Sequence, residues 1–161
     1  MTARDSSVHR AVGAVALAVA FAGSTVACAA VAPASGDAST PSASTQEFQA
    51  VYDAVAASDP RVERASTVST SLSGVTTQLT VVVRVSGDEP ISTQTLTAVL
   101  VAIRDSAPGD ANMLDLVARD AQNPKEILDL SDAISALPSG MSLVWIDGGL
   151  VVPIEDLRLL A

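Results

Sequence analysis

The amino-acid sequence predicts an α+β fold, a two-layer sandwich in which helices pack on one face of a mostly antiparallel sheet. Along residues 47–161, stretches with apolar residues at helical spacing are interspersed with stretches of period-two alternation. This region of about 115 residues is long enough to form one core without disulfides. Because aromatic residues make up only 2% of the chain, we expect a core of Val, Leu, Ile and Ala.

The first elements are predicted to be an amphipathic helix and a β-hairpin. The helix is indicated by apolar residues at i, i+3, i+4 and i+7, namely Phe48, Val51, Tyr52 and Val55. It ends at Asp59-Pro60, because the residue before a proline disfavours helical geometry. The clearest strand of the chain alternates over residues 75–86 and is rich in β-branched residues. A weaker strand over residues 62–72 precedes it, with a hairpin turn at Ser73-Gly74.

A second helix and a third strand follow the hairpin. Ser92 is suited to cap the helix, and Ile91 and Leu96 stand in hydrophobic-staple positions. Pro108-Gly109 closes this helix. Residues 113–119 then alternate as a strand. We expect one face to carry Leu114, Leu116 and Ala118, and the other to carry Asp115 and Arg119.

Residues 123–137 allow two interpretations. Asn123-Pro124-Lys125-Glu126 combines an N-cap, a proline at the first helical position and an acid three residues after the cap, which favours one helix to Leu137. The alternative is a short strand over residues 126–130, followed by a short helix that Ser131 caps and Pro138 ends.

The chain closes with two short strands over residues 142–147 and 150–152, around a hairpin signal at Gly148-Gly149. A helical turn is expected over residues 154–160. The predicted order is therefore helix, strand, strand, helix, strand, helix, strand, strand, helix.

Charge and composition exclude several classes of function. The chain has one Cys and one His, so a disulfide framework, a Cys-rich zinc site and a His-based triad are disfavoured. With 9 basic and 18 acidic residues, its formal net charge is −9. This acidity argues against nucleic-acid binding, which needs clustered Lys and Arg.

The N-terminal segment has the organisation of a secretory signal peptide. A polar stretch with Arg4 and Arg10 precedes thirteen residues without a charge, 11–23. The segment Thr25-Val26-Ala27-Cys28 resembles the lipobox of bacterial lipoproteins, although Leu is usual where Thr25 stands. The resemblance implies cleavage just before Cys28 and a diacylglycerol thioether on that residue, which would anchor the protein on the extracytoplasmic face of the cell membrane.

These features predict three parts: a signal peptide over residues 1–27, a lipidated Cys28 with an Ala/Ser/Pro-rich flexible tether to residue 46, and a folded head over residues 47–161. Two alternatives are ordinary secretory cleavage within residues 29–34 and an uncleaved anchor over residues 11–36. Cleavage before Cys28 would leave 7 basic and 17 acidic residues and remove the only His. The preference for Arg over Lys, with abundant Ala and Val, is typical of a high-GC bacterium such as an actinobacterium.

Residue types needed for catalysis or metal binding are scarce in the head. Lys125 is the only Lys, and its neighbours favour a solvated helical turn over a Ser-Lys catalytic arrangement. Several aspartates recur in the second half of the chain: Asp105, Asp110, Asp115, Asp120, Asp129 and Asp132. Their spacing does not place them on one helical face, so solvated acids are favoured over a calcium site. Phosphate-cradling Gly motifs are absent from the sequence, and we predict no cofactor.

Trp145, in a predicted short strand, is interpreted as a half-buried packing residue or, alternatively, as an anchor at a partner surface. The sequence thus favours a membrane-anchored extracytoplasmic lipoprotein with a non-enzymatic binding or assembly domain at the cell envelope. One alternative is an envelope hydrolase that uses carboxylates, or a Ser without His. The other is a carrier of a small apolar ligand.

Overall fold

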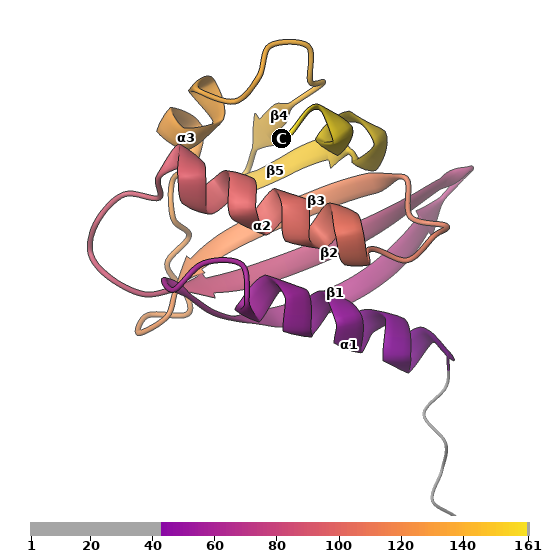
Figure 1. Ribbon diagram of the computed structural model, residues 1–161, viewed down its shortest axis with the longest axis horizontal. Coiled ribbons are helices and arrows are strands. Elements are labelled where there is room, and N and C mark those ends of the chain that lie inside the picture. The colour runs from indigo at the N-terminus through magenta and orange to yellow at the C-terminus, as the bar shows by residue number, and fades with distance from the viewer. Residues whose placement is uncertain (1–42, 161) are drawn as a thin grey trace, which may run out of the picture. The chain divides into compact units, whose positions relative to one another are not determined.

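Five strands form one mixed sheet in the order β1-β2-β3-β5-β4, with helices packed against it (Figure 1). The strands are β1 (Val62–Ser73), β2 (Thr76–Val85), β3 (Met113–Asp120), β4 (Val144–Ile146) and β5 (Gly149–Pro153). Strands β2 and β3 are parallel, and the other neighbouring strands are antiparallel. This arrangement confirms the predicted α+β class.

The computed structural model describes residues 43–160. The predicted signal peptide, Cys28 and the tether up to residue 42 lie outside the described residues. Within residues 43–160, none of the helices combines the length and the apolar character needed to cross a membrane.

Four helical segments complete the predicted order of elements: α1 (Ala43–Ala56), α2 (Thr93–Ser106), α3 (Ser131–Ser135) and the 3-10 helix η1 (Ile154–Leu159). Helix α1 begins at Ala43 rather than near Glu47, so the boundary predicted between tether and head falls inside a helix. Helix α2 crosses over the sheet to connect β2 to β3, as a parallel pair requires (Figure 1). Both α1 and α2 lie on the same side of the sheet (Figure 1).

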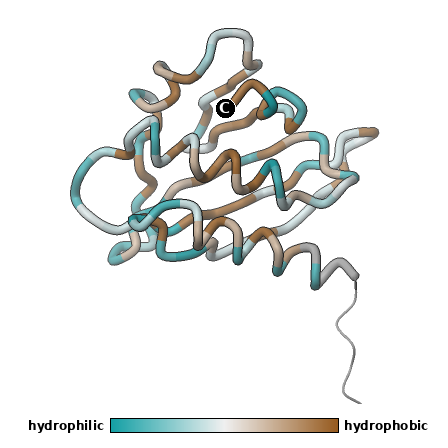
Figure 2. Tube along the Cα trace, in the orientation of Figure 1, coloured by the Kyte–Doolittle hydropathy of each residue, from teal (hydrophilic) through white to brown (hydrophobic). Residues whose placement is uncertain are grey.

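The core lies between this helical layer and one face of the sheet. From β2 and β3 it takes every second residue, namely Leu79, Val81, Val83, Val85, Leu114, Leu116 and Ala118, and β1 and β5 add further members. Hydrophobic and hydrophilic positions alternate along α1 and α2, as helices with one buried face require (Figure 2). The predicted cap of α2 is confirmed, because the Ser92 hydroxyl accepts a hydrogen bond from the Thr95 backbone N–H (3.1 Å).

The favoured helix over residues 123–137 is wrong. Ile127 instead forms an antiparallel bridge with Arg119, and helix α3 spans only Ser131–Ser135. The physical reason is an unfilled edge: β5 pairs with β3 only as far as Leu116. Beyond that point the backbone of residues 126–128 supplies hydrogen-bond partners for the edge of β3. The Leu128 N–H donates to Ala118 O (2.9 Å), and the Asp120 N–H donates to Glu126 O (3.2 Å).

The alternative interpretation placed a strand there, which is closer to the structure, but the helix cap differs. Ser131 is the first residue of α3 rather than its cap, and the N-cap residue Leu130 makes no side-chain capping hydrogen bond. Just before it, Asp129 Oδ1 accepts a hydrogen bond from the Ser131 N–H (2.8 Å). Both hairpin turns also lie one residue away from their predicted positions, at Gly74-Val75 and Asp147-Gly148. Asp147 and Gly148 have φ of 52° and 77°, as expected for a tight turn of type I′.

Candidate functional site: the open face of the sheet

The face of the sheet opposite the helices is lined by the strand residues that alternate with the core. The strand registers arrange these residues in rows that run across the sheet. We call this surface the open face; its outward-pointing residues include Arg64, Thr67, Ser69, Thr80, Val82, Arg84, Asp115, Val117, Arg119, Ile127, Val144, Ile146 and Val151. None of these residues belongs to the buried core.

An apolar strip crosses the open face. It consists of six aliphatic residues: Val82, Val117, Ile127, Val144, Ile146 and Val151. The side chains near β4 are strongly solvated, with relative exposures of 54% for Val144, 55% for Ile146 and 41% for Ile127. A Cβ built on Gly148 would lie 2.7 Å from Ile127 Cγ2, so the isoleucine packs directly over this glycine. The strip therefore continues from the β4–β5 hairpin onto the segment that completes the edge of β3.

Three arginines lie side by side along one end of the same face. Arg64 is the cross-strand partner of Arg84, and Arg84 is the partner of Arg119. We call these three residues the arginine row. Two of them are held by backbone carbonyls. Arg84 Nη1 donates to Asp120 O (3.3 Å), and Arg119 Nη1 donates to Pro124 O (3.0 Å).

The arginine row has no carboxylate partner among residues 43–160. The ion pair found in this part of the chain joins Arg104 Nε to Asp105 Oδ1 (2.7 Å), away from the row. The Arg84 Nε atom is buried and makes no hydrogen bond to the described residues. The guanidinium groups of Arg84 and Arg119 are therefore positioned by the fold, and none of the three is paired with a carboxylate of the described residues.

Asp115 also lies on the open face, and Val117 separates it from Arg119 along β3. Partial burial raises the pKa of its carboxyl group, and a hydrogen bond from Gln78 Nε2 to Asp115 Oδ2 (3.3 Å) opposes this shift. Its backbone position pairs with Thr80 on one side and Val151 on the other. Neither paired position carries a second acid.

An acidic hollow of about 560 Å³ lies where β2 and β3 end. Five acids line it: Asp88, Glu89, Asp120, Glu126 and Asp129. Three of them, Asp120, Glu126 and Asp129, already accept hydrogen bonds from neighbouring residues in this segment. Asp120 Oδ1 accepts hydrogen bonds from the N–H groups of Gln122 and Asn123, and Asp129 accepts that of Ser131. The Ser131 hydrogen bonds lower the pKa of Asp129, because they stabilise its charged form.

The aspartates considered for a calcium site do not gather at one place, and only Asp120 and Asp129 share a hollow. Asp105 is paired with Arg104, Asp115 is on the open face, and Asp132 is in α3, whereas Asp120 and Asp129 line the acidic hollow. Among residues 43–160, no group of three or more His, Cys, Asp or Glu side chains is arranged to hold a metal ion.

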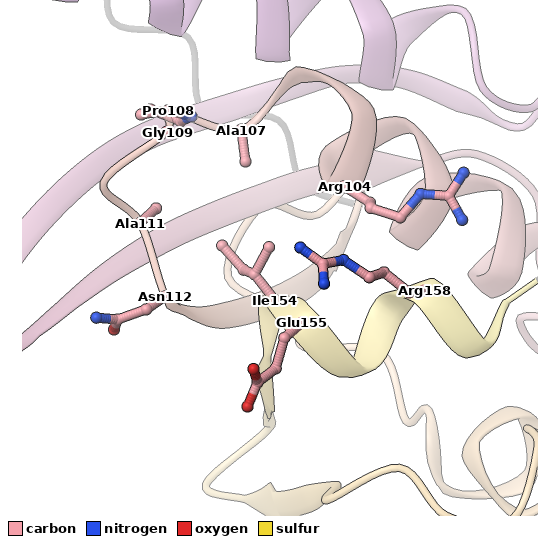
Figure 3. Close-up of a pocket in the computed structure, with 9 residues that line it drawn as sticks. All are labelled: Arg104, Ala107, Pro108, Gly109, Ala111, Asn112, Ile154, Glu155 and Arg158. Atoms are coloured by element: carbon pink, nitrogen blue, oxygen red, sulfur yellow. The ribbon is translucent and has the colours of Figure 1, made fainter.

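A second hollow, of about 370 Å³, lies between the end of α2 and η1 (Figure 3). Arg104 lines it, but its guanidinium is already used, because Nη1 donates to Leu160 O (3.0 Å) and Nε binds Asp105. Arg158, Glu155 and Ile154 reach this hollow from η1 (Figure 3). Its lining contains no Ser, Thr or Lys, and Glu155 is its carboxylate.

The apolar space between the sheet and α2 is nearly filled. A cavity of about 10 Å³ lies among core residues such as Val83, Leu96 and Leu130. This volume is about that of one water-sized probe, so it does not support the alternative of an apolar-ligand carrier.

The structure separates the residues singled out from the sequence. Trp145 is half-buried and packs against the core, because its partner Leu150 belongs to the core face. Its neighbours Val144 and Ile146 point to the open face instead. Lys125 is exposed in the turn whose Pro124 carbonyl binds Arg119. Sequence reasoning missed the arginine row, although strand alternation already placed Arg84 and Arg119 outward.

Three comparisons with known proteins find no match: neither a family model, nor a curated protein, nor a solved structure resembles this chain.

Proposed function

We propose that this protein is a lipoprotein of the bacterial envelope, anchored through Cys28, whose head binds a protein partner through the open face without catalysing a reaction. The observation that carries the binding role is the exposed apolar strip. Ile127, Val144 and Ile146 hold aliphatic side chains in water on a regular sheet surface. Contiguous exposed apolar surface on a small domain is typical of interaction sites.

The rigidity of the strip supports binding rather than chemistry. Val82, Val117 and Val151 are strand residues in register, so their side chains stand at fixed spacing on the sheet. A partner that covers them gains about 25 cal/mol for each Å² of apolar surface removed from water. Little ordering of the head would oppose this gain, because the strands are already fixed by the core beneath them.

The anchoring part of the proposal rests on the lipobox-like segment that ends at Cys28. A lipid anchor followed by a short tether would keep the head near the outer surface of the membrane. A partner in the same envelope would then meet the open face at a raised effective concentration.

Site-specific photo-crosslinking in living cells tests the proposal. A photoreactive residue replaces Ile146 on the open face, and a matched control replaces Gln94, which is exposed on α2. We expect a discrete covalent adduct with another protein from position 146 and none from position 94. The same strain carrying Cys28→Ser should release the protein from the membrane fraction into the medium.

Each part of the proposal has its own contrary outcome. Absence of an adduct from position 146, or equal adducts from both positions, contradicts binding through the open face. Retention of the Cys28→Ser protein in the membrane fraction contradicts lipid anchoring.

A further inference from the structure

We infer that the open face receives an acidic segment of its protein partner, whose carboxylates bind the arginine row of Arg64, Arg84 and Arg119. The inference rests on the proposed function, because it names the chemistry of the partner that the open face would bind. It follows from four features of the described residues: charge placement, hydrogen bonding, the neighbouring apolar strip and the balance of charge over the head.

The first feature is the placement of like charges beside one another. Directly opposed like charges destabilise a sheet, and here Arg84 has an arginine neighbour on each side. The chain has 18 acidic residues and all but Asp5 and Asp37 follow residue 43, yet none forms an ion pair with the row among the described residues. Glu63, in the β-bulge next to Arg64, also makes no ion pair there. An anionic group from outside would remove this repulsion.

The second feature is that the guanidinium groups of Arg84 and Arg119 are oriented by hydrogen bonds but retain free donors. A guanidinium has five N–H donors in a planar fork that matches a carboxylate. The carbonyls of Asp120 and Pro124 each take one donor, from Arg84 and Arg119 respectively. The buried and unbonded Nε of Arg84 is left without an acceptor. A partner carboxylate therefore meets a pre-positioned fork, and little side-chain entropy is lost on binding.

The third feature is the apolar strip beside the row. Val82 and Val117 are two residues from Arg84 and Arg119 along the same strands and point to the same face. Neighbouring strands are about 4.8 Å apart, so the row can engage carboxylates separated by about 5–6 Å, as on one side of a helix. The expected partner segment thus combines two or more Asp or Glu residues with adjacent aliphatic side chains.

The fourth feature distinguishes a protein segment from other anionic surfaces. Residues 43–160 contain far more acids than bases, so an extended anionic membrane surface would also meet many of these acids, whereas a short acidic segment can contact the row alone. The half-buried Arg84 also suits a side chain that reaches into the row better than a flat lipid surface. A second copy whose twofold axis passed through the row would bring the same three arginines against each other, which is unfavourable.

A titration with a defined acidic probe tests the inference. The full-length protein in neutral detergent is mixed with an oligoglutamate peptide flanked by leucines, or with the same peptide carrying Gln in place of Glu. Binding is followed through the NMR signals of the arginine Nε–H groups. We expect the Arg84 and Arg119 signals to shift with the Glu peptide only, and the shift to shrink as salt is raised.

Matched variants give the size of the effect of each arginine on the Kd for the Glu peptide. Loss of a hydrogen bond to a charged group corresponds to a Kd increase of about tenfold or more, which we expect for Arg84→Gln and for Arg119→Gln. Arg158→Gln removes an exposed arginine of η1 and should leave the Kd unchanged. Thermal unfolding of each variant shows whether it remains folded. If Arg84→Gln does not fold, Arg119→Gln tests the same prediction.

Several outcomes would overturn the inference. The Gln peptide could bind as tightly as the Glu peptide, or Arg158→Gln could raise the Kd as much as Arg84→Gln does. The protein could instead sediment with phosphatidylglycerol vesicles in an Arg84-dependent way without binding the peptide, or form a dimer that depends on Arg84. Failure of this inference remains distinguishable from failure of the proposed function. If the adduct from position 146 persists in the Arg84→Gln and Arg119→Gln variants, binding through the open face is supported, but an acidic partner held by the arginine row is contradicted.

Discussion

Asp115 shows how a single charged residue on the open face affects stability. Its carboxyl group is partly buried, and this burial raises its pKa above the ordinary value, while only the Gln78 amide is placed to stabilise the charged form. The folded protein therefore holds the proton more tightly than the unfolded chain does. By linkage, the stability contribution of this group is greatest at acidic pH and is lost as the pH rises through the folded-state pKa.

We accordingly expect Asp115→Asn to stabilise the head slightly at neutral pH. The gain should be roughly half a kcal/mol or less, because most of the carboxyl group is screened by solvent. The unfolding free energy of the variant should also fall less between mildly acidic and neutral pH than that of the wild-type protein. Urea unfolding at the two pH values measures both effects. A neutral-pH stability that falls on this substitution would show that the charged form is favoured in the fold. Asp110→Asn, in an exposed turn, is the matched control.

At the scale of elements, the β4–β5 hairpin and residues 126–128 together complete the sheet next to β3. Residues 113–116 of β3 pair with β5, and the bridge at Arg119 is made by Ile127. Ile127 then packs over the hairpin turn at Gly148. This contact links a segment without regular structure to the edge hairpin, and both carry parts of the apolar strip.

Gly148→Ala tests that link. Gly148 has a φ of 77°, which is unfavourable for alanine, and the new Cβ would lie 2.7 Å from Ile127 Cγ2. We expect a loss of about 1–3 kcal/mol in unfolding free energy, from backbone strain and steric overlap together. In the Ile127→Ala background the overlap is removed, and the same glycine substitution should have a smaller effect. A double-mutant cycle by urea unfolding measures this coupling, and strictly additive effects would contradict the packing of Ile127 on the turn.

The same region shows where local sequence patterns are insufficient. Asn123-Pro124-Lys125-Glu126 has every local feature of a helix start, yet the free edge of β3 determines its structure. Asp120 binds the N–H groups of Gln122 and Asn123, which holds the chain in a turn before a helix can begin. Backbone groups at a sheet edge need partners, and this tertiary requirement outweighs local propensity.

At the scale of the whole molecule, periodicity was sufficient to predict the order of elements, the core faces of β2 and β3 and the cap of α2. It could not predict the arginine row. Alternation shows that Arg84 and Arg119 point away from the core, but only strand order and register place them beside each other and beside Arg64. Register depends on contacts between residues distant in sequence, and a shift of one residue would turn every side chain to the other face.

The distribution of the core leads to a prediction about the two ends of the chain. All core residues found in the described region lie between Val51 and Leu160. Leu160 is 4% exposed, and its carbonyl accepts a hydrogen bond from Arg104 Nη1 (3.0 Å). Removal of residues 1–42 should therefore leave the unfolding free energy unchanged, whereas removal of Leu160 and Ala161 should lower it by about 2–4 kcal/mol.

Leu160→Ala keeps the length of the chain and the backbone carbonyl, so it should lose only the part of this energy that comes from burial. Thermal and urea unfolding of the three proteins measure the differences. An equal loss after removal of residues 1–42 would contradict an independently folding head, and an unchanged stability without residues 160–161 would contradict the structural role of Arg104. If the expected asymmetry holds, the head carries its own stability, and the N-terminal segment is free to serve the proposed anchor at Cys28.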